Sequence, residues 1–566
     1  MTTATKRSAT ELLKESSQRL RGTIGTELAA GGTQVSDAAE ALLKFHGTYE
    51  QYDRDTATAL KTQGLEKEYS FMVRVRMPGG RLTAAQYLAL DALADRYGNA
   101  TLRVTTRQTI QFHGIVKGNL KPAIAAINAT LLTTQSTCGD VVRNVTTSAA
   151  PRRDAAHARL LADACLLSAD LLPRSRAYHE IFLDAAPDET TGEETEPLFG
   201  PTYLPRKFKI GLALPQDNTI DVLSNDLGLI AIWEEGVLRG YNVAVGGGMG
   251  MTHNRPDTYP RLASLVGSVG PDELRALAEA VVRVQRDHGG RADRKRARLK
   301  YLVDDQGLPW VREAIGRELG HALADPLPMP AFEVPDLLGW HEQGDGGWWL
   351  GVKLPAGRIA DAGTVRLRTA LREVVQRYGI DPVLTPQQDV LLTNIAPRLR
   401  SAITRKLRAH GVTMAGEITP LARWAMACVA LPTCGLALTE AERVRAPLVA
   451  DLEAVLRRHG LERERISLRI TGCPNGCARS YGGDIGLVGR VPGAYAVFVG
   501  GDFAGTRLSF KLLERVAQER VVAVLEPLLA TFAQQGWRGE GFGDFCHRLG
   551  PEAALALVEG VQASAA

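Results

Sequence analysis

Four cysteines towards the C-terminal end have the type and spacing of metal ligands. Cys428 and Cys434 stand in MACVALPTCGLALTEAER, and Cys473 and Cys477 stand in RITGCPNGCARS. Zinc sites usually carry closer cysteine pairs, whereas four thiolates also suit an iron–sulfur cluster. From spacing alone, an iron–sulfur cluster, a zinc site and ordinary buried thiols all remain open. The cysteines outside this set are expected to be buried or incidental thiols: Cys138, Cys165 and Cys546.

A second set of residues places cations along predicted strands. In residues 102–113 the polar side chains share one parity and therefore point to one face of a strand: Arg103, Thr105, Arg107, Thr109, Gln111 and His113. Further cations stand in FMVRVRM, GDVVRNV, PRKFKIGLAL and a helix predicted over residues 291–301: Arg74, Arg76, Arg143, Arg206, Lys207, Lys209, Arg294, Lys295, Arg296, Arg298 and Lys300. A solvated face explains each cation singly. Together they also suit a pocket for a polyanion, and glycines 246–248 permit close backbone approach to a flat group.

The composition limits the class of protein. The chain has 566 residues, 45% of them hydrophobic and 23% charged, which predicts a soluble protein of several domains. A net charge of +4 is far below the excess expected of a general nucleic-acid binder. No segment suits a signal peptide or a membrane span, and seven cysteines are too few for a disulfide framework. We therefore expect a cytoplasmic protein that binds neither nucleic acid nor membrane.

Pairs of similar segments indicate an internal duplication that must position these residues. FMVRVRMPGGRLT (71–83) and ALADRYGNATLRVTTRQTIQF (92–112) resemble WWLGVKLPAGRIA (348–360) and EVVQRYGIDPVLTPQQDVLL (373–392). Each predicts a strand, a turn, a helix ending near Gly98 or Gly379, and another strand. The predicted hairpins at residues 229–250 and 485–505 form a weaker match. We predict an α+β protein with pseudo-twofold symmetry, an exposed loop at residues 184–201 and a linker at residues 325–336.

These motifs together resemble the siroheme-dependent sulfite and nitrite reductase family. The matching segments are FMVRVRMPGG, LRVTTRQTIQFHG, RNV, TYLPRKFK, NVAVGGGMG, ACVALPTCGLALTEAER and TGCPNGCAR, and the similarity spans about residues 18–550. The resemblance implies an internally duplicated α+β fold with ferredoxin-like half-domains. The implied divisions are an N-terminal extension (1–60), a first half-domain (61–125), a first reductase domain on the siroheme and substrate side (126–335), a second half-domain (336–412) and a second domain that binds the cluster and siroheme (413–566).

The resemblance also implies cofactors and residue roles. Siroheme and a [4Fe–4S] cluster are the expected cofactors, and the six-electron reduction of sulfite to sulfide is the expected reaction. The four cysteines Cys428, Cys434, Cys473 and Cys477 would hold the cluster, with Cys477 also bridging to the siroheme iron. Positions that match siroheme contacts are Arg103, Thr105, Arg107, Gln111, Arg206, Arg298, Lys300, Asn475 and Cys477. Positions that match the cations around the substrate anion are Arg74, Arg143, Lys207 and Lys209.

The sequence departs from the family pattern at three places, one of which is the atypical SYGGDIG (480–486) after the last cysteine motif. Val142 stands where the family usually has Asn before the arginine of RNV, and Gln387, Gln388 and Asp389 replace a usual Asn-Gln-Asn. A carboxylate at Asp389, if it lay near siroheme, would disfavour a bound anion. These changes put the cofactor contacts in doubt, but not the family.

Two other functions are kept as alternatives, and the electron donor is open. A siroheme nitrite reductase, which forms ammonia from nitrite, typically has Asn in place of the second lysine, so Lys209 favours sulfite. A zinc-stabilised nucleic-acid-binding protein is the alternative from another class. No flavin or nicotinamide motif appears, so a partner must supply electrons: a ferredoxin or an NADPH-oxidising flavoprotein. The segment GWHEQGDGG (339–347) is similar to the ferredoxin-dependent branch.

Overall fold

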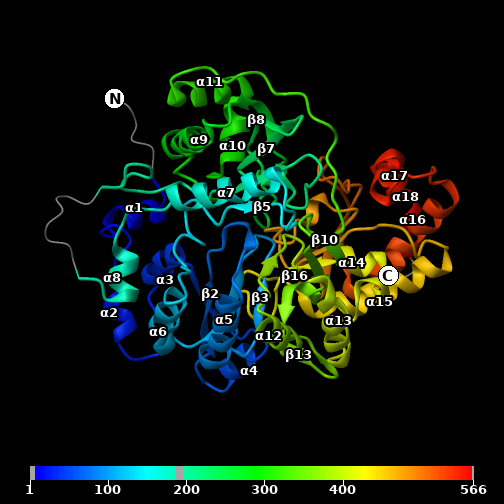
Figure 1. Cartoon of the computed structure of the whole chain (residues 1–566), viewed down its shortest axis with the longest axis horizontal. Coiled ribbons are helices and arrows are strands. Elements are labelled where there is room, and N and C mark those ends of the chain that lie inside the picture. Colours follow the sequence, from blue (N-terminus) through cyan, green and yellow to red (C-terminus); the bar gives the residue numbers. More distant parts are fainter. Residues whose placement is uncertain (1–6, 187–194, 564–566) are drawn as a thin grey trace.

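Two antiparallel sheets are built from the same order of elements, as the duplication predicts (Figure 1). The computed structural model describes residues 7–186 and 195–563. The first sheet has the strand order β1-β2-β4-β3-β12, and the second has the order β10-β11-β16-β15. The strands of the first sheet are β1 (Thr48–Tyr52), β2 (Tyr69–Arg74), β3 (Leu102–Val104), β4 (Ile110–Ile115) and β12 (Arg358–Ile359). Those of the second are β10 (Gly339–Glu342), β11 (Trp348–Val352), β15 (Pro382–Leu384) and β16 (Val390–Ile395).

Each of these sheets carries a matched pair of helices. The helices α5 (Ala84–Tyr97) and α6 (Lys117–Asn128) belong to the first sheet, and α12 (Leu367–Tyr378) and α13 (Arg400–Ala409) belong to the second. The chain order is therefore strand, helix, strand, strand, helix in both half-domains. Across the pseudo-twofold axis α12 packs on α5, where Arg368 Nε donates to the buried carboxylate of Asp91 at 2.6 Å.

The two half-domains also exchange backbone pairing. β12, which follows β11 in the second half-domain, pairs antiparallel with β3 of the first sheet, so that Arg358 lies opposite Arg103. In return, Arg81 of the first half-domain forms an antiparallel bridge with Val383 on β15. Neither sheet is complete without a residue supplied by the other half.

Two larger sheets repeat a second topology. Their orders are β5-β6-β7-β8-β9 and β17-β18-β19-β20-β21, and in each the first three strands are parallel and the last two antiparallel. The first set is β5 (Thr146–Thr147), β6 (Ile210–Ala213), β7 (Leu227–Glu234), β8 (Val237–Val245) and β9 (Ser264–Val269). The second is β17 (Met426–Ala427), β18 (Leu468–Thr471), β19 (Ile485–Val491), β20 (Ala494–Val499) and β21 (Phe510–Ala517).

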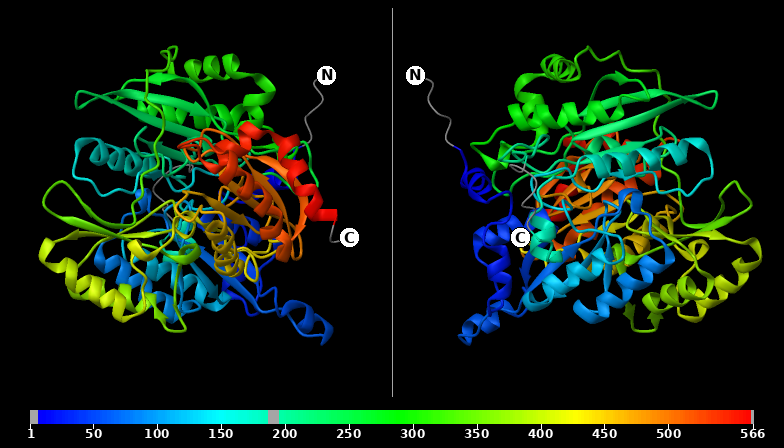
Figure 2. Two further views of the ribbon diagram at one scale, coloured as in Figure 1. Left: turned by 90° about the vertical axis from the view of Figure 1, so that its right-hand side faces the viewer. Right: turned by 60° about the vertical axis from the view of Figure 1, so that its left-hand side comes forward.

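The remaining helices cover these sheets and the N-terminal side. Those around the first large sheet are α7 (Ala155–Asp170), α9 (Leu274–His288), α10 (Leu299–Gln306) and α11 (Leu308–Leu319), whereas α8 (Ala177–Leu183) packs on α6. Those around the second are α14 (Pro420–Trp424), α15 (Glu442–Arg458), α16 (Val521–Gln535), α17 (Phe542–Leu549) and α18 (Pro551–Ala563), and Figure 2 shows the last three against its strands. The N-terminal helices are α1 (Ala9–Ser16), α2 (Ile24–Ala29), α3 (Asp37–Leu43) and α4 (Ala57–Thr62), and a small hairpin is formed by β13 (Asp361–Ala362) and β14 (Val365–Arg366).

Two apolar cores hold these layers together. One joins both half-domains with the first large sheet, and the other fills the C-terminal domain. No helix in the described part of the chain combines the length and apolar character that a membrane crossing requires.

A pair of glutamines shows how closely the duplication is kept. Gln108 and Gln388 occupy equivalent tight turns with left-handed φ values of 53° and 66°. The Gln108 amide donates to Gly79 O at 3.3 Å and accepts from Thr147 N at 3.0 Å. The Gln388 amide makes the equivalent bonds, donating to Ala356 O at 3.4 Å and accepting from Ala427 N at 3.3 Å. Each glutamine thus ties a half-domain to the first strand of a large sheet.

Two sequence predictions of local structure are wrong. Residues 102–113 form a hairpin rather than one strand, because Thr105 N donates to Thr109 O and Gln108 N to Thr105 O, which closes a turn. Residues 291–301 are not one helix: a 3-10 turn at Arg294–Arg296, capped by Asp293, precedes α10, which begins at Leu299. The loop predicted at 184–201 lies in part outside the described residues, since residues 187–194 are not among them.

Glu442, the first residue of α15, joins the two repeats where β12 meets β3. Its carboxylate accepts from Arg358 at 2.7 and 2.9 Å and from Arg103 Nε at 3.2 Å. Burial alone would raise the pKa of Glu442, but Arg103 and Arg358 outweigh it and hold the pKa below its ordinary value. The folded state therefore favours the charged carboxylate.

We expect Glu442→Gln to lower the free energy of unfolding by about 3 kcal/mol at pH 7, because two arginines lose their shared counter-charge. The folded pKa lies below the unfolded value of about 4.3, so the wild-type advantage is complete above that pH and shrinks as the pH falls through the folded pKa. Urea denaturation followed by tryptophan fluorescence, at neutral pH and below about pH 4, measures the difference. Glu313→Gln breaks an exposed pair with Arg317 and, as the control, should change little. An equal difference at both pH values contradicts this role of Glu442.

Candidate functional site

The four cysteines lie where neighbouring parallel strands end. Cys428 follows β17 directly, and Cys473 comes two residues after β18. Backbone amides and one side chain already point at the sulfurs: Gly472 N donates to Cys428 Sγ at 3.3 Å, and Asn475 Nδ2 donates to Cys473 Sγ at 3.5 Å. Because the carboxyl ends of parallel strands meet at one edge of a sheet, the two cysteine loops converge.

The pKa values of these thiols reflect their proximity. Burial, followed by the neighbouring Cys477, raises the pKa of Cys428 well above its ordinary value and that of Cys473 to about 12. Burial also raises the pKa of Cys434, whereas Cys477 is exposed. Metal ligands are thiolates, so metal binding here must displace protons.

A single metal ion and a four-iron cluster place different demands on four thiolates. Within residues 7–186 and 195–563, no three His, Cys, Asp or Glu side chains lie close enough together to hold one metal ion. A tetrahedral zinc site needs such convergence, since each Zn–S bond is only about 2.3 Å long. A four-iron cluster instead takes one thiolate at each corner of a cube.

A group of cations faces the exposed cysteine. Lys207 and Lys209 stand just before β6, and neither ammonium group makes a hydrogen bond to any residue that the structure describes. Burial, followed by Arg206 and Lys209, lowers the pKa of Lys207 well below its ordinary value. Burial, followed by Arg107 and Arg298, lowers the pKa of Lys209 to about 7, and the Cys477 sulfur lies near enough to oppose that shift.

Arg143 and Arg74 complete this cation group. Arg143 is buried, with Nε donating to Gly139 O at 2.9 Å and Nη1 to Thr137 O at 3.2 Å. Arg74, at the end of β2, donates through Nη1 to Cys138 Sγ at 3.3 Å, while its buried Nε has no partner in the described part of the chain. Among the described residues, none of the four side chains predicted to surround the substrate forms an ion pair with a carboxylate, and burial lowers the pKa of both lysines.

Arg107 extends from the turn between β3 and β4 into the same region. Its guanidinium donates to Asn225 Oδ1 at 2.9 Å and Ile210 O at 3.1 Å, and also to Asn144 O. Its Nε is buried without a partner among the described residues. Burial, followed by Arg143, lowers the pKa of Arg107 to about 9. The turn also contacts the cysteine loop, because the Thr106 hydroxyl donates to Cys477 O at 3.0 Å.

A glycine loop closes one side of the site. After β8, a Cβ at Gly247 would lie 2.2 Å from Leu223 O, and a Cβ at Gly248 would lie 2.7 Å from the Arg298 guanidinium. Lys300 fixes the loop by donating to Gly248 O at 3.1 Å and Gly250 O at 2.7 Å. The loop reaches the cysteines, since Met251 N donates to Pro474 O at 3.0 Å. Small residues are therefore required here by the packing.

Several side chains that were predicted to contact the cofactor form hydrogen bonds or ion pairs with other protein groups. Arg298 is held by both oxygens of Asp226, at 2.9 and 2.7 Å, and Arg103 donates to Glu442 and, at 2.9 Å, to Ala427 O. Arg206 lies 3.8 Å from the Asp140 carboxylate. The two neutral residues are similar: Thr105 shares a hydrogen bond with Thr109 at 2.7 Å, and Gln111 Nε2 donates to Met72 Sδ at 3.4 Å. Their roles at a cofactor stay predictions.

The departures from the family pattern do not open into the cation group. Val142 is fully buried in the first core. Asp389 accepts from Leu354 N at 3.0 Å and pairs with Lys353 at 3.3 Å, and burial raises the pKa of Asp389. Gln387 donates to Thr219 O at 3.1 Å, and Gln388 makes the link to Ala427 described above. Sequence analysis suggested that a carboxylate at Asp389 could repel a bound anion. In the structure this carboxylate is paired with Lys353.

Sequence reasoning missed the residues that position the cations. Asp226 holds Arg298 and also accepts from Lys209 N at 2.9 Å. Asn144 accepts from Met77 N at 2.9 Å and donates to Arg107 O at 2.9 Å, and Asn225 contacts Arg107. The available signal was a run of Asn and Asp next to a wholly apolar strand, where buried polar groups need partners.

Two family models match four segments of the chain. The model described as "Nitrite and sulphite reductase 4Fe-4S domain" matches residues 162–323 and 421–563. The model described as "Nitrite/Sulfite reductase ferredoxin-like half domain" matches residues 63–130 and 341–410. The chain belongs to the nitrite and sulphite reductase family, and the double match of each model confirms the internal duplication.

Individual proteins of this family are similar to the chain over nearly its whole length. The chain is 47% identical over 547 residues to the sulfite reductase [NADPH] hemoprotein beta-component of Xanthomonas campestris pv. campestris, covering 95% of this chain and 96% of the relative. It is also 47% identical to the protein of that name from Xylella fastidiosa, over 96% of both chains. Among solved structures, the Mycobacterium tuberculosis NirA protein superposes with a TM-score of 0.79 at 26% identity, covering 97% of this chain and 98% of that one.

We expect Cys434→Ser to lower the acid-labile sulfide of the purified protein from roughly four atoms per chain to well under half of that, and the iron from roughly five atoms, four of the cluster and one of siroheme, by a matching number, because one corner of the cluster loses its thiolate. The measurement is iron and sulfide analysis per mole of protein. Cys165→Ser, which removes an exposed thiol from α7, is the matched control and should keep full iron. Full iron content in Cys434→Ser would contradict the assignment of Cys434 as a ligand.

Proposed function

We propose that this chain is the hemoprotein component of an assimilatory sulfite reductase, which reduces sulfite to sulfide by six electrons with siroheme and a [4Fe–4S] cluster. The observation that carries the proposal is the ammonium of Lys209, which lies near Cys477 and makes no hydrogen bond or ion pair with any described residue. That position suits an anion bound next to a metal centre. The relatives at 47% identity are named for this activity.

The residues around this position fit siroheme, an iron tetrapyrrole with many carboxylates. Polar atoms are left buried without partners among the described residues at Arg74 Nε, Arg107 Nε and both ring nitrogens of His113. Buried donors of this kind are costly unless a ligand satisfies them. The glycine loop after β8 gives a flat group room against the backbone. We propose Arg103, Thr105, Arg107, Gln111, Arg206, Arg298, Lys300, Asn475 and Cys477 as the residues around siroheme.

When bound, the two cofactors supply the iron that takes the sulfur atom and the path for electrons. The chain's own part is electrostatic. Arg74, Arg143, Lys207 and Lys209 attract the sulfite anion and stabilise the negative charge that grows on oxygen as S–O bonds break. The lysine ammonium groups also carry protons for the departing oxygens, which leave as water. Burial around these groups strengthens each of these interactions.

Sulfite is favoured over nitrite by the number of cations. Lys207 and Lys209 stand two residues apart before β6, and neither ammonium group forms an ion pair with a described carboxylate. A more highly charged anion gains more from the second of them. A nitrite reductase is therefore the second candidate. It shares the cofactors but needs less positive charge.

The electron donor and the domain limits are part of the proposal. We propose an NADPH-oxidising flavoprotein as donor, because the relatives are named as the beta-component of an NADPH enzyme. The proposed location is the cytoplasm. We also keep the division into residues 1–60, 61–125, 126–335, 336–412 and 413–566 as the functional units.

The direct test is a visible absorption spectrum of the purified protein, followed by sulfide production from sulfite with reduced methyl viologen as donor. Strong tetrapyrrole bands and sulfite-dependent oxidation of the donor are expected. A colourless protein with stoichiometric zinc would refute the proposal and favour the zinc alternative.

We expect Lys209→Asn to lower kcat/KM for sulfite more than for nitrite, because the second cation is lost. One charge-assisted contact is worth about 1.5–3 kcal/mol, or roughly ten- to a hundredfold in apparent affinity. The measurement is the ratio of kcat/KM for the two anions with reduced methyl viologen. Lys295→Asn, in the exposed 3-10 turn before α10, is the control and should leave the ratio unchanged. An unchanged ratio in Lys209→Asn, with siroheme and iron content retained, would remove Lys209 from substrate selection.

A further inference from the structure

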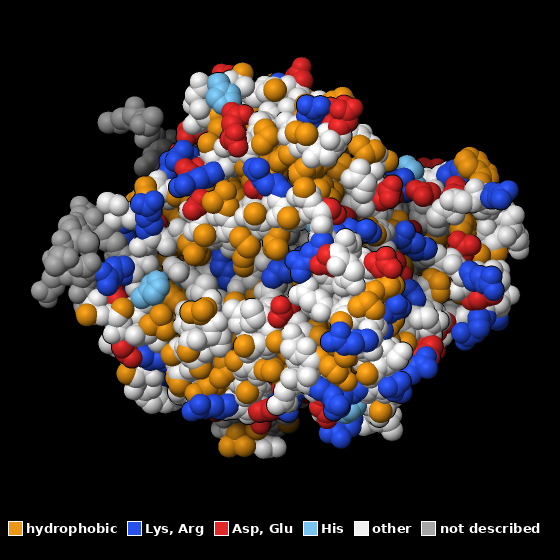
Figure 3. Space-filling view, viewed as in Figure 1, with side chains coloured by type: hydrophobic (Ala, Val, Ile, Leu, Met, Phe, Trp, Pro, Cys, Tyr) orange, Lys and Arg blue, Asp and Glu red, His pale blue; other side chains and the backbone are white. Residues whose placement is uncertain are grey.

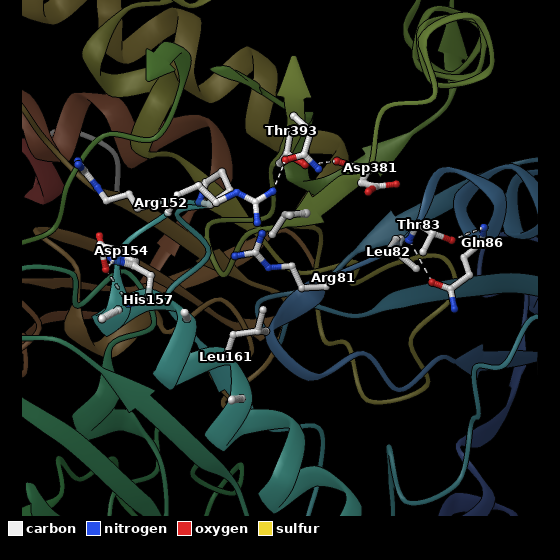
Figure 4. A pocket seen from close by; sticks show the side chains of 17 residues that line it. Arg81, Leu82, Thr83, Gln86, Arg152, Asp154, His157, Leu161, Asp381 and Thr393 are labelled. Atoms are coloured by element: carbon white, nitrogen blue, oxygen red, sulfur yellow. Dashed lines mark hydrogen bonds and ion pairs between the residues drawn. The ribbon is translucent and has the colours of Figure 1, made fainter. Parts of the chain in front are cut away.

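A second cationic cavity lies away from the cysteines, on the other side of the duplicated fold. Its volume is about 810 Å³, and it is enclosed by α7, the segment after the 3-10 turn η2 (Pro78–Gly80), and the β15–β16 hairpin. Figure 4 shows Arg81 reaching between α7 and this hairpin. In Figure 3, Lys and Arg side chains gather at the middle of this face, between the positions of α7 and β16. None of the residues proposed above for cofactors or substrate lines it.

The two repeats differ in how they treat an equivalent arginine, and among the described residues Arg81 has no carboxylate in an ion pair. Arg81 and Arg358 are equivalent: each follows a 3-10 turn and pairs across to the hairpin of the other half-domain. Arg358 is held by Glu442, the first residue of α15. The buried residues of α7 and α15 align Leu160 with Leu448, which places Asp154, the N-cap of α7, at the position of Glu442. Asp154 accepts from His157 N and contacts the His157 ring, so it forms no ion pair with Arg81 like the one that holds Arg358.

The surroundings of Arg81 are positive. Its Nε is buried without a partner in the described part of the chain, and the side chain as a whole is only partly exposed. Burial, followed by the charge of Arg153, lowers the pKa of Arg81 to about 10, and the other titratable neighbour is the thiol of Cys165. Burial raises the pKa of that thiol, so it is neutral at pH 7.

The carboxylates of the cavity are already engaged. Asp154 accepts from His157 N at 2.9 Å and from the His157 ring at 2.8 Å, and Asp381 accepts from Ala84 N at 2.8 Å. The lining therefore holds three arginines and a histidine against two carboxylates: Arg81, Arg152, Arg153, His157, Asp154 and Asp381. Arg153 also lies 3.2 Å from Asp345 outside the lining.

We propose that this cavity binds a small organic molecule that carries a phosphate or sulfate group, with Arg81 as the main anion contact. A guanidinium buried beside a second arginine suits a tetrahedral oxyanion, which takes two parallel N–H bonds. The space is far larger than one inorganic oxyanion, and Leu82, Leu161 and Val383 give it apolar walls for an organic body. The site is independent of the proposed sulfite reduction, because it shares no residue with it.

The test is isothermal titration of the holoenzyme with adenosine monophosphate and, separately, with inorganic phosphate. The decisive variant is Ala155→Glu, which adds a carboxylate to the lining of the cavity at the first residue of α7. A glutamate in the first turn of a helix is favourable, so this variant should fold as well as the wild type. Arg81→Gln removes the contact directly, and Arg317→Gln, at an exposed residue of α11, is the control.

Because the cation group near Cys477 also attracts anions, the relevant signal is the binding that Ala155→Glu removes. We expect that variant and Arg81→Gln to weaken this binding by about ten- to a hundredfold, and Arg317→Gln to leave it unchanged. Adenosine monophosphate should bind the wild type more tightly than phosphate does. Binding by Ala155→Glu that matches the wild type in stoichiometry and affinity would overturn the site, and equal affinities for the two probes would overturn the organic ligand.

Discussion

The burial of positive charge beside the cysteine loops governs the architecture of the site. Transferring a guanidinium or ammonium group out of water is costly unless partners replace the lost solvent. The chain meets this need in two ways. Asp226 and Glu442 neutralise Arg298 and Arg103, while backbone carbonyls alone receive Arg143 and Lys300. The ammonium groups of the two lysines before β6 have no such partner among the described residues, so they are free to attract an anionic ligand.

The glycine loop and the glutamine turns follow from the same constraint. Carbonyl groups can receive a cation only where the backbone comes close, and the loop after β8 brings Gly248 O and Gly250 O to Lys300. The turn that carries Arg107 is fixed by Gln108, which is bonded to both the half-domain and β5. Rigid turns hold the cations in place without acids that would compete with the ligand.

Much of this arrangement was readable from the sequence. The cysteine set, the cations and the duplication all appear as residue types at fixed spacing, and the structure brings Lys207, Lys209, Arg143 and Arg74 together. The turn at residues 105–109 was missed because polar residues keep the same parity on both sides of a tight hairpin. Asp226 and Asn225 were missed because a contact such as Arg107 to Asn225, 118 residues apart, leaves no mark in local periodicity. Long-range polar pairs of this kind depend on tertiary packing.

The two repeats share the same backbone arrangement but differ in their side chains. Gln108 and Gln388 make the same bonds, while Arg107 is matched by Gln387 and Arg103 by Val383 across the equivalent turns. Only one copy therefore concentrates cations near the cysteine loops. The scaffold of each half supports the other, and the chemistry is confined to one side of the axis.

The exchanged pairing between half-domains bears on how the chain is made. A ribosome releases β3 about 255 residues before Arg358 of β12, its edge partner. At about 5–20 residues per second, the nascent first sheet waits on the order of ten to fifty seconds with that edge open. An open edge pairs readily with strands of other chains. Translation speed and chaperone access in that interval should therefore govern the yield of native protein more than the stability of the finished fold.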